Sequence, residues 1–175
     1  MAKKNLTINP EDRTFSLDRA LIPGGNWRNF SGGPTKFDPR NTKQFFEIFL
    51  SDEEAEKIKA LGYNVKWLEP RNDSEPKQAH LRIFINYNVP ARFQPKIWLV
   101  PQGEKPELQK KDTIGLFDGA TIERAKIQVR PYDWELASGS KGTKAMLNQA
   151  YMVLEEDDFG AEFYESEGEE EVPFE

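Results

Sequence analysis

The side chains with the clearest chemical potential are aromatic rings that share a strand face with a lysine or an arginine. In two alternating segments, Arg82 accompanies Phe84 and Lys96 accompanies Trp98 on the side opposite the apolar face. Large apolar groups on an outward face are costly unless something covers them. Such rings stack with nucleobases, while neighbouring cations follow the phosphates. The pattern is therefore typical of a surface that holds a single strand of nucleic acid without regard to its sequence.

The same combination of bases and rings recurs elsewhere in the chain. Further candidates for nucleic-acid contact are Lys43, Lys126, Arg130, Tyr132 and Trp134 on or beside expected strands, and Trp27, Arg28 and Phe30 between two glycine-rich turns. A structural alternative stays open for both groups. The strand rings could pack beneath a loop or against a helix, and the glycine-flanked segment could pin the N-terminal residues onto the body.

Few side chains offer catalytic chemistry. The chain has no cysteine and a single histidine, which excludes thiol catalysis and thiolate metal sites and disfavours a histidine-based triad. Asp133 and Glu135, with Lys141, resemble a metal-dependent nuclease centre only weakly, because their spacing is wrong. The glycine pairs at 24–25 and 32–33 lack the lysine and hydroxyl residue that end a phosphate-binding loop. We predict a protein that is not an enzyme and that holds no metal or cofactor.

The elements that must position these residues are mostly strands. Alternation of apolar and polar residues predicts them at 43–50, 64–68, 80–88, 96–100, 123–130 and 143–154. Residues 101–113 are charged and contain proline, which indicates a loop, and the glycines of 114–121 favour a bend or a turn of helix. The run Pro131-Tyr132-Asp133-Trp134 is expected to end the fifth strand.

One helix is indicated directly after the first strand. Ser51 is a good N-cap, and Glu54 three residues later completes a capping box. Ala55 and Ile58 lie on one stripe, and Gly62 marks the C-terminal end. The helix should therefore lie flat on a core.

Short strands with a single helix predict a mainly β fold, an OB-fold-like antiparallel β-barrel. We expect three parts: an extended, weakly ordered N-terminal segment over 1–25, an OB-like single-stranded-DNA-binding domain over 26–154, and an acidic disordered tail over 155–175. No apolar run approaches the ~20 residues of a membrane helix, so no membrane partner is expected.

The charge is divided unevenly along the chain. The net charge is -6, but residues 155–175 hold eleven acids and no base, so residues 1–154 hold 30 − 11 = 19 acids against 24 bases, a net of +5. Such a block of like charge favours disorder. It could serve solubility, or it could compete with nucleic acid for a basic groove. Its aromatic residues are candidates for binding partner proteins: Phe159, Phe163, Tyr164 and Phe174.

Three blocks of the sequence are NWRNFSG, LGYNVKWLEPRNDSEP and RPYDWELASGSKGTKAMLNQAYMVLEED. Over roughly residues 26–158 they resemble a family of tailed-phage proteins regarded as single-stranded-DNA-binding proteins. The resemblance implies an OB-type barrel, no catalytic activity, and a role in replication or recombination in the cytoplasm of the infected bacterium. The tail is also similar to those of bacterial and phage single-strand binders, which recruit replication proteins and end in an aromatic residue. Here Glu175 follows Phe174, which departs from that ending.

We therefore interpret the chain as a sequence-tolerant single-stranded-DNA-binding protein whose tail recruits replication or recombination proteins and shields the groove. Two alternatives stay open. One is an RNA-binding regulator on the same scaffold, because a preference for the 2′-hydroxyl cannot be seen in the sequence. The other is a structural or DNA-mimicking interaction protein that works through its acidic tail.

Overall fold

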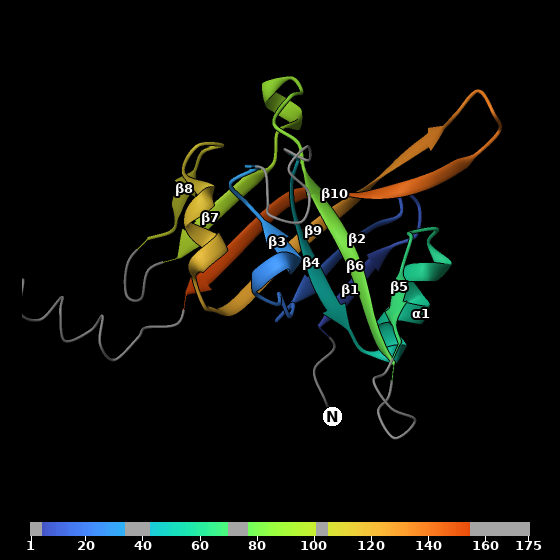
Figure 1. Cartoon of the computed structure of the whole chain (residues 1–175), viewed down its shortest axis with the longest axis horizontal. Helices are drawn as coiled ribbons and strands as arrows, with labels where there is room; N and C mark the ends of the chain where they lie inside the picture. The colour runs from blue at the N-terminus through green and yellow to red at the C-terminus, as the bar shows by residue number, and fades with distance from the viewer. Residues whose placement is uncertain (1–4, 34–42, 70–76, 101–104, 155–175) are drawn as a thin grey trace, which may run out of the picture.

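A computed structural model of the chain describes residues 5–33, 43–69, 77–100 and 105–154 (Figure 1). This described part is mainly β, as predicted, with one α-helix and three short 3₁₀ turns. The strands are β1 Leu6–Asn9, β2 Thr14–Asp18, β3 Arg28–Asn29, β4 Gln44–Leu50, β5 Lys66–Leu68, β6 Gln78–Ile85, β7 Lys96–Val100, β8 Glu107–Gln109, β9 Ile122–Glu135 and β10 Lys141–Leu154. The helix is α1 Asp52–Ala60, and the 3₁₀ turns are Gly25–Trp27, Ala91–Phe93 and Ile114–Gly119.

The strands form a single curved sheet in the order β1-β2-β9-β10-β6-β4-β3, with β5, β7 and β8 attached beside it. The sheet departs from the predicted antiparallel barrel in two pairings, because β10 runs parallel to both β6 and β7. These two strands follow one another along the same edge of β10. They are two parts of one interrupted strand, and the interrupting segment contains Pro90 and Pro95, which lack the N–H that a ladder needs.

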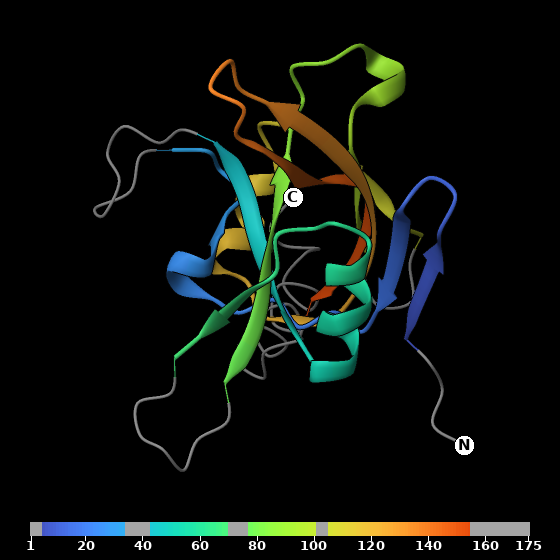
Figure 2. The ribbon, with the colours of Figure 1, turned by 90° about the vertical axis from the view of Figure 1, so that its right-hand side faces the viewer.

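The hydrogen-bonded ladder does not close into a barrel. Between β9 and β4 a single stretch of chain spans the gap: Ala20 N donates to Ala125 O of β9 at 2.9 Å, and Phe49 N of β4 donates to Leu21 O at 2.8 Å. The strands nevertheless curve around one apolar core, as the view in Figure 2 shows. This nearly closed arrangement is consistent with an OB-like fold.

The N-terminal residues differ from the weakly ordered lead that the sequence led us to expect. β1 and β2 form an antiparallel hairpin, and β2 continues the sheet by pairing with β9 (Figure 2). Phe15 and Leu17 of β2 are almost completely buried in the core. Alternation in Thr14–Asp18 turns these two apolar side chains inward, so the hairpin belongs to the folded body.

Helix α1 confirms the predicted capping box. Ser51 Oγ accepts a hydrogen bond from Glu54 N at 3.2 Å, and Glu54 Oε1 accepts one from Ser51 N at 3.0 Å. Ala55 and Ile58 are fully buried against the sheet, so the helix lies on the core through the predicted stripe. Gly62, just beyond its end, has a φ of 104°, a conformation that favours glycine.

The longest element is the hairpin formed by β9 and β10, which projects from the body (Figure 1). β9 does not end at Pro131 as expected. Pro131 is paired with Ala145, and the ladder continues through Trp134 opposite Gly142. The segment expected to be a loop likewise contains the short strand β8, which pairs with β7. The extension of β9 places the aromatic residues after Pro131 on a strand face instead of in a turn.

Candidate nucleic-acid interface

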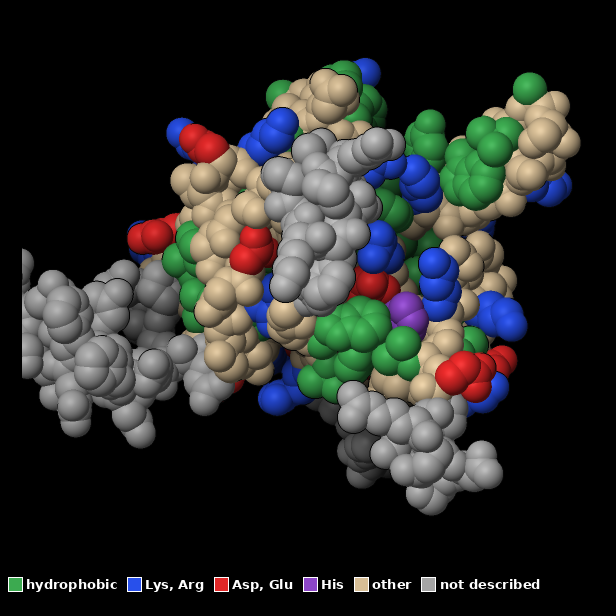
Figure 3. Space-filling model, in the orientation of Figure 1, with side chains coloured by type: hydrophobic (Ala, Val, Ile, Leu, Met, Phe, Trp, Pro, Cys, Tyr) green, Lys and Arg blue, Asp and Glu red, His purple; other side chains and the backbone are tan. Residues whose placement is uncertain are grey.

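Two adjoining hollows, of about 560 and about 630 Å³, lie over β6 and the half of the β9–β10 hairpin nearer its turn. Phe84 and Lys144 line both hollows, so the two adjoin, and we call them together the trough. Figure 3 shows Lys and Arg side chains (blue) between the projecting hairpin and the histidine (purple). The basic side chains that line the trough are Lys43, Lys66, Arg82, Lys111, Lys141 and Lys144. Its aromatic residues are Tyr63, Phe84, Tyr87, Tyr132 and Trp134.

Strand pairing explains why residues distant in sequence meet in the trough. Phe84 of β6 lies opposite Met146 of β10 in the parallel pair, and Met146 lies opposite Arg130 of β9. Two residues before Met146, Lys144 lies opposite Tyr132. Directly paired residues project to the same face of a sheet. The parallel pairing of β6 with β10 therefore builds one surface from segments about sixty residues apart.

Arg82 lines the trough with its guanidinium held in place. Its Cζ atom lies 3.9 Å from the centre of the Phe45 ring, and its NH2 group donates to Glu47 Oε2 at 3.2 Å. The other carboxylate oxygen, Glu47 Oε1, lies 2.6 Å from His80 Nδ1. Trp27 packs edge-on against the His80 ring at a centroid distance of 5.2 Å. Glu47 is thus buried but fully paired, which offsets the cost of placing a charge there.

Trp134 is positioned by the absence of a side chain opposite it. A Cβ atom at Gly142 would lie 2.7 Å from Trp134 Cζ2 and 2.9 Å from Cε2. The indole therefore lies directly on the β10 backbone. Lys144 Nζ lies 5.1 Å from the centre of the Phe84 ring, within the range of a cation–π contact. The Lys144 ammonium and the rings of Phe84 and Trp134 thus all lie beside β10 in the trough.

The electrostatic character of the trough is strongly positive. Six Lys and Arg side chains line it, and among the residues that line it the only carboxylate is the paired Glu47. A depression with one sign of charge concentrates ligands of the opposite sign. Phosphates along a strand are such ligands.

The nuclease-like residues do not form a metal centre. Asp133 accepts hydrogen bonds from Arg13 NH2 and from Thr143 Oγ1, and these bonds, that from Arg13 foremost, hold its pKa below the usual value. Its carboxylate is therefore committed to joining the N-terminal hairpin to β9. Across the described residues, no group of three or more Asp, Glu, His or Cys side chains is arranged to hold a metal ion.

Two candidate residues from the glycine-flanked segment are buried. Phe30 has no exposed surface and stacks on Phe46 at a centroid distance of 5.3 Å. The Arg28 side chain donates to four backbone carbonyls, those of Ile22, Pro23, Phe117 and Ala120.

Neither Arg28 nor Phe30 can therefore reach a bound strand in this structure. The expectation of an accessible aromatic and basic loop is wrong for this pair, because tertiary contacts cover the segment. Trp27, next to them, is half-buried between Phe49 and His80. The open structural alternative, a segment pinned to the body, describes all three.

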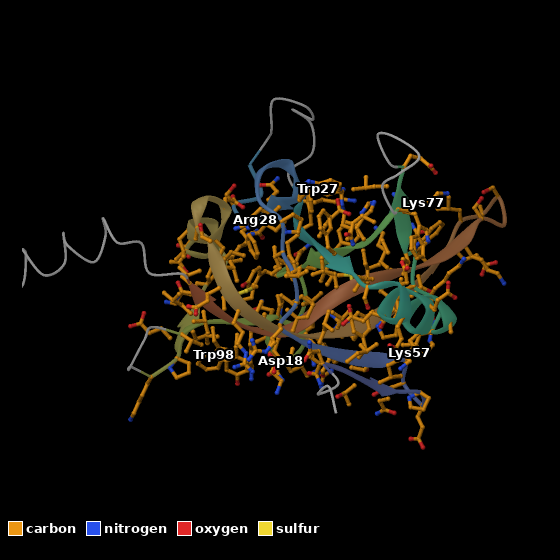
Figure 4. The ribbon with its side chains drawn as sticks, turned by 90° about the horizontal axis from the view of Figure 1, so that it is seen from below. Asp18, Trp27, Arg28, Lys57, Lys77 and Trp98 are labelled. Atoms are coloured by element: carbon orange, nitrogen blue, oxygen red, sulfur yellow. The ribbon has the colours of Figure 1, made fainter. Side chains whose placement is uncertain are left out.

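Three other candidates lie further along the sheet, outside the trough. Trp98 of β7 stacks on Tyr151 of β10 with a centroid distance of 6.1 Å, and Lys126 of β9 lies opposite Tyr151. Lys96 is exposed at the start of β7. In Figure 4, Trp98 lies on the side of the molecule opposite Trp27. The structure therefore divides the predicted set between the trough and a second group around Trp98, and binding measurements decide which of the two holds a strand.

Several trough residues were missed in the sequence. Lys144 and Lys141 belong to a strand whose outward face was not assigned, and alternation from the buried Ala145 and Leu147 could have found Lys144. No aromatic residue stands two positions before or after Lys66 or Lys111, so no local pattern of the sequence marks these two lysines. The tail residues Phe159, Phe163, Tyr164 and Phe174 lie outside the described residues.

A mainly β body with a basic, aromatic depression is the architecture of proteins that bind single-stranded nucleic acid. A family model described as "Putative phage ssDNA-binding domain" matches residues 13–171. The chain belongs to this family of phage single-stranded-DNA-binding domains. A comparison with curated protein sequences gives no match.

Solved structures of one phage protein share the fold. The single-stranded DNA-binding protein from bacteriophage Enc34 in complex with ssDNA is 11% identical, with a TM-score of 0.52 over 91% of this chain and 96% of that chain. Its C-terminal truncation is 10% identical, with a TM-score of 0.51 over 90% and 94%. A further structure of the Enc34 protein is 11% identical, with a TM-score of 0.51 over 91% of this chain and 90% of that chain. At this identity the likeness shows the fold alone.

Proposed function

We propose that the chain binds single-stranded DNA along the trough, without a catalytic step and without preference for sequence. The observation that carries the proposal is the meeting of six cations with the rings of Phe84, Tyr132 and Trp134 in one depression. Membership of the phage family and the fold shared with the Enc34 protein support the same ligand.

The chemistry of the trough explains tolerance of sequence. Every base has a π-face, so stacking on an aromatic side chain contributes ~1–3 kcal/mol per base whatever the base is. Contacts from lysine to phosphate likewise position a strand without reading its sequence. If all six cations neutralise phosphates, the slope of log K against log salt concentration approaches about −0.7 × 6, or roughly −4.

The biological setting is a proposal that follows from the family. We place the protein in the replication or recombination of phage DNA in the cytoplasm of the infected bacterium. We assign the acidic segment 155–175 to recruitment of replication or recombination proteins and to competition for the trough. The support for this assignment is the negative charge of residues 155–175 in the sequence. The segment lies outside the residues that the structure describes. No helix in the described part is long and apolar enough to cross a membrane.

The test is a titration of the full-length protein with fluorescent oligo-dT at several salt concentrations, with Phe84→Ala and Trp98→Ala as a pair. Phe84 lines the trough, and Trp98 stacks on Tyr151 outside it. We expect Phe84→Ala to weaken binding about fivefold or more, and Trp98→Ala to leave it near that of the wild type.

An affinity that does not change with salt would show that charge in the trough does not hold the DNA. A larger loss of affinity from Trp98→Ala than from Phe84→Ala would place the site around Trp98. Oligo-U RNA of equal length tests whether the protein prefers ribose or deoxyribose. If the protein binds that RNA more tightly than oligo-dT, its ligand is RNA and not DNA.

A further inference from the structure

Arg82 differs from the other cations of the trough in how firmly it is held. The Phe45 ring covers one face of its guanidinium at 3.9 Å, and Glu47 Oε2 binds one of its nitrogen atoms. The Arg82 side chain is nevertheless 41% exposed. The guanidinium is planar, with one face covered by Phe45, one edge held by Glu47 and the rest exposed. This geometry is suited to stacking.

Glu47 is in an unexpected place for a groove that binds a polyanion. It is the only carboxylate that lines the described trough, and its side chain is 6% exposed. A negative charge there repels phosphates, so a role must offset that cost. The carboxylate uses one oxygen for Arg82 and the other for His80, and Trp27 packs edge-on against His80.

We propose that Arg82 is a preorganised platform on which a nucleobase stacks, and that Glu47 and His80 are the positioning residues that hold it. The stack would run from Phe45 through the guanidinium to the base. Arginine stacks on π-faces because its guanidinium is planar and weakly hydrated, whereas a lysine ammonium acts as a compact charge. The inference rests on the proposed binding of single-stranded DNA in the trough.

The first experiment separates stacking from charge by replacing Arg82 with lysine in the full-length protein. The probes are oligo-dT and an abasic oligonucleotide of equal length, which carries the phosphates without bases. We expect Arg82→Lys to bind oligo-dT about fivefold more weakly, with the salt slope unchanged and affinity for the abasic strand unchanged.

Arg92→Lys is the matched control. Arg92 is exposed, its Cζ atom lies 4.7 Å from the centre of the Phe93 ring, and it does not line the trough. The same substitution there should leave both affinities unchanged. Equal affinity of Arg82→Lys and wild type for oligo-dT would overturn the platform, as would an equal loss on both probes.

The second experiment tests Glu47 as a positioning residue by measuring whether its replacement weakens or strengthens DNA binding. Glu47→Gln removes a negative charge from a groove for phosphates, so simple electrostatics expects tighter binding. If the amide oxygen faces Arg82, the NH2 group must donate to His80 Nδ1, and the charge-assisted bond that holds the guanidinium becomes a weaker neutral one. We therefore expect binding of oligo-dT to weaken at least twofold, again without loss on the abasic strand.

Glu135→Gln is the control for charge alone, because Glu135 is exposed on the hairpin beside the trough. It should bind as tightly as the wild type or more tightly. Tighter binding by Glu47→Gln would overturn the positioning role. If that variant does not fold, as the melting temperature reports, Arg82→Lys still decides the proposal. Failure of the wild type to bind oligo-dT would instead overturn the proposed function itself.

Discussion

Substitution of Gly142 by alanine should weaken DNA binding through a ring that the new methyl group displaces. Gly142 lies opposite Trp134 in the β9–β10 ladder, and the added Cβ would lie 2.7 Å from the indole. Carbon atoms in contact prefer about 3.5–4.0 Å. The indole must therefore move by roughly 1 Å or rotate away from its place in the trough.

The expected magnitude follows from the stacking that the ring supplies. Complete loss of one stacked base costs ~1–3 kcal/mol, and a displaced ring keeps part of this. We expect a loss near the lower end, about 1 kcal/mol, which is roughly a fivefold increase in Kd. The melting temperature should change little, because alanine in an extended strand carries no backbone strain.

The assay is fluorescence anisotropy with oligo-dT, in a double-mutant cycle with Trp134→Ala. Once the ring is absent, the alanine at Gly142 should cost nothing more, so the two effects should not add. Gly119→Ala is the control, because its Cβ would meet no atom within 4 Å and it lies outside the trough. An equal loss from Gly142→Ala in both backgrounds would refute the role of the ring.

Four further outcomes follow from the same structure. Lys144→Gln should weaken binding to all sequences alike and make the salt slope shallower by about 0.7; an unchanged slope would show that this lysine meets no phosphate. Arg28→Ala leaves one buried and three part-buried carbonyls without their donor, so calorimetry should show a melting temperature lower by roughly 6–12 °C, from about 3 kcal/mol; a change within 2 °C would show that water replaces the guanidinium. The hydrogen bond from Arg124 lowers the pKa of Asp18, so this pair stabilises the fold above about pH 4 and is lost as the pH falls through the lowered pKa; thermal melts of wild type and Asp18→Asn should therefore differ at pH 6, and the difference should shrink as the pH is lowered further into the acid range. The fragment 1–154 should bind oligo-dT more tightly than the full chain at low salt and equally at high salt; equal affinities at low salt would leave partner recruitment as the tail's only proposed role.

The outer face of β6 illustrates what local alternation predicts well. Arg82 and Phe84 were expected outward and line the trough, while Leu81 and Ile83 were expected inward and are buried. The capping box of α1 was equally evident. These features depend on residues a few positions apart, so propensity and periodicity suffice to find them.

The N-terminal hairpin and Arg28 show where local reasoning fails. Alternation states that the two faces of a strand differ, but not what covers the outer one. Glycine-rich turns around Arg28 indicated a free loop, yet its guanidinium is enclosed by carbonyls from segments about ninety residues away. Such enclosure depends on the whole fold.

The sequence by itself determined the class of this protein: a mainly β body with outward rings and bases, followed by an acidic segment. Only the tertiary structure decided which rings share a surface. Phe84 and Lys144 meet because β6 runs parallel to β10, while Trp98 pairs with the same strand further along and lies outside the trough. Strand pairing is a long-range choice made by the packing of the entire core, and no spacing within a single strand records it.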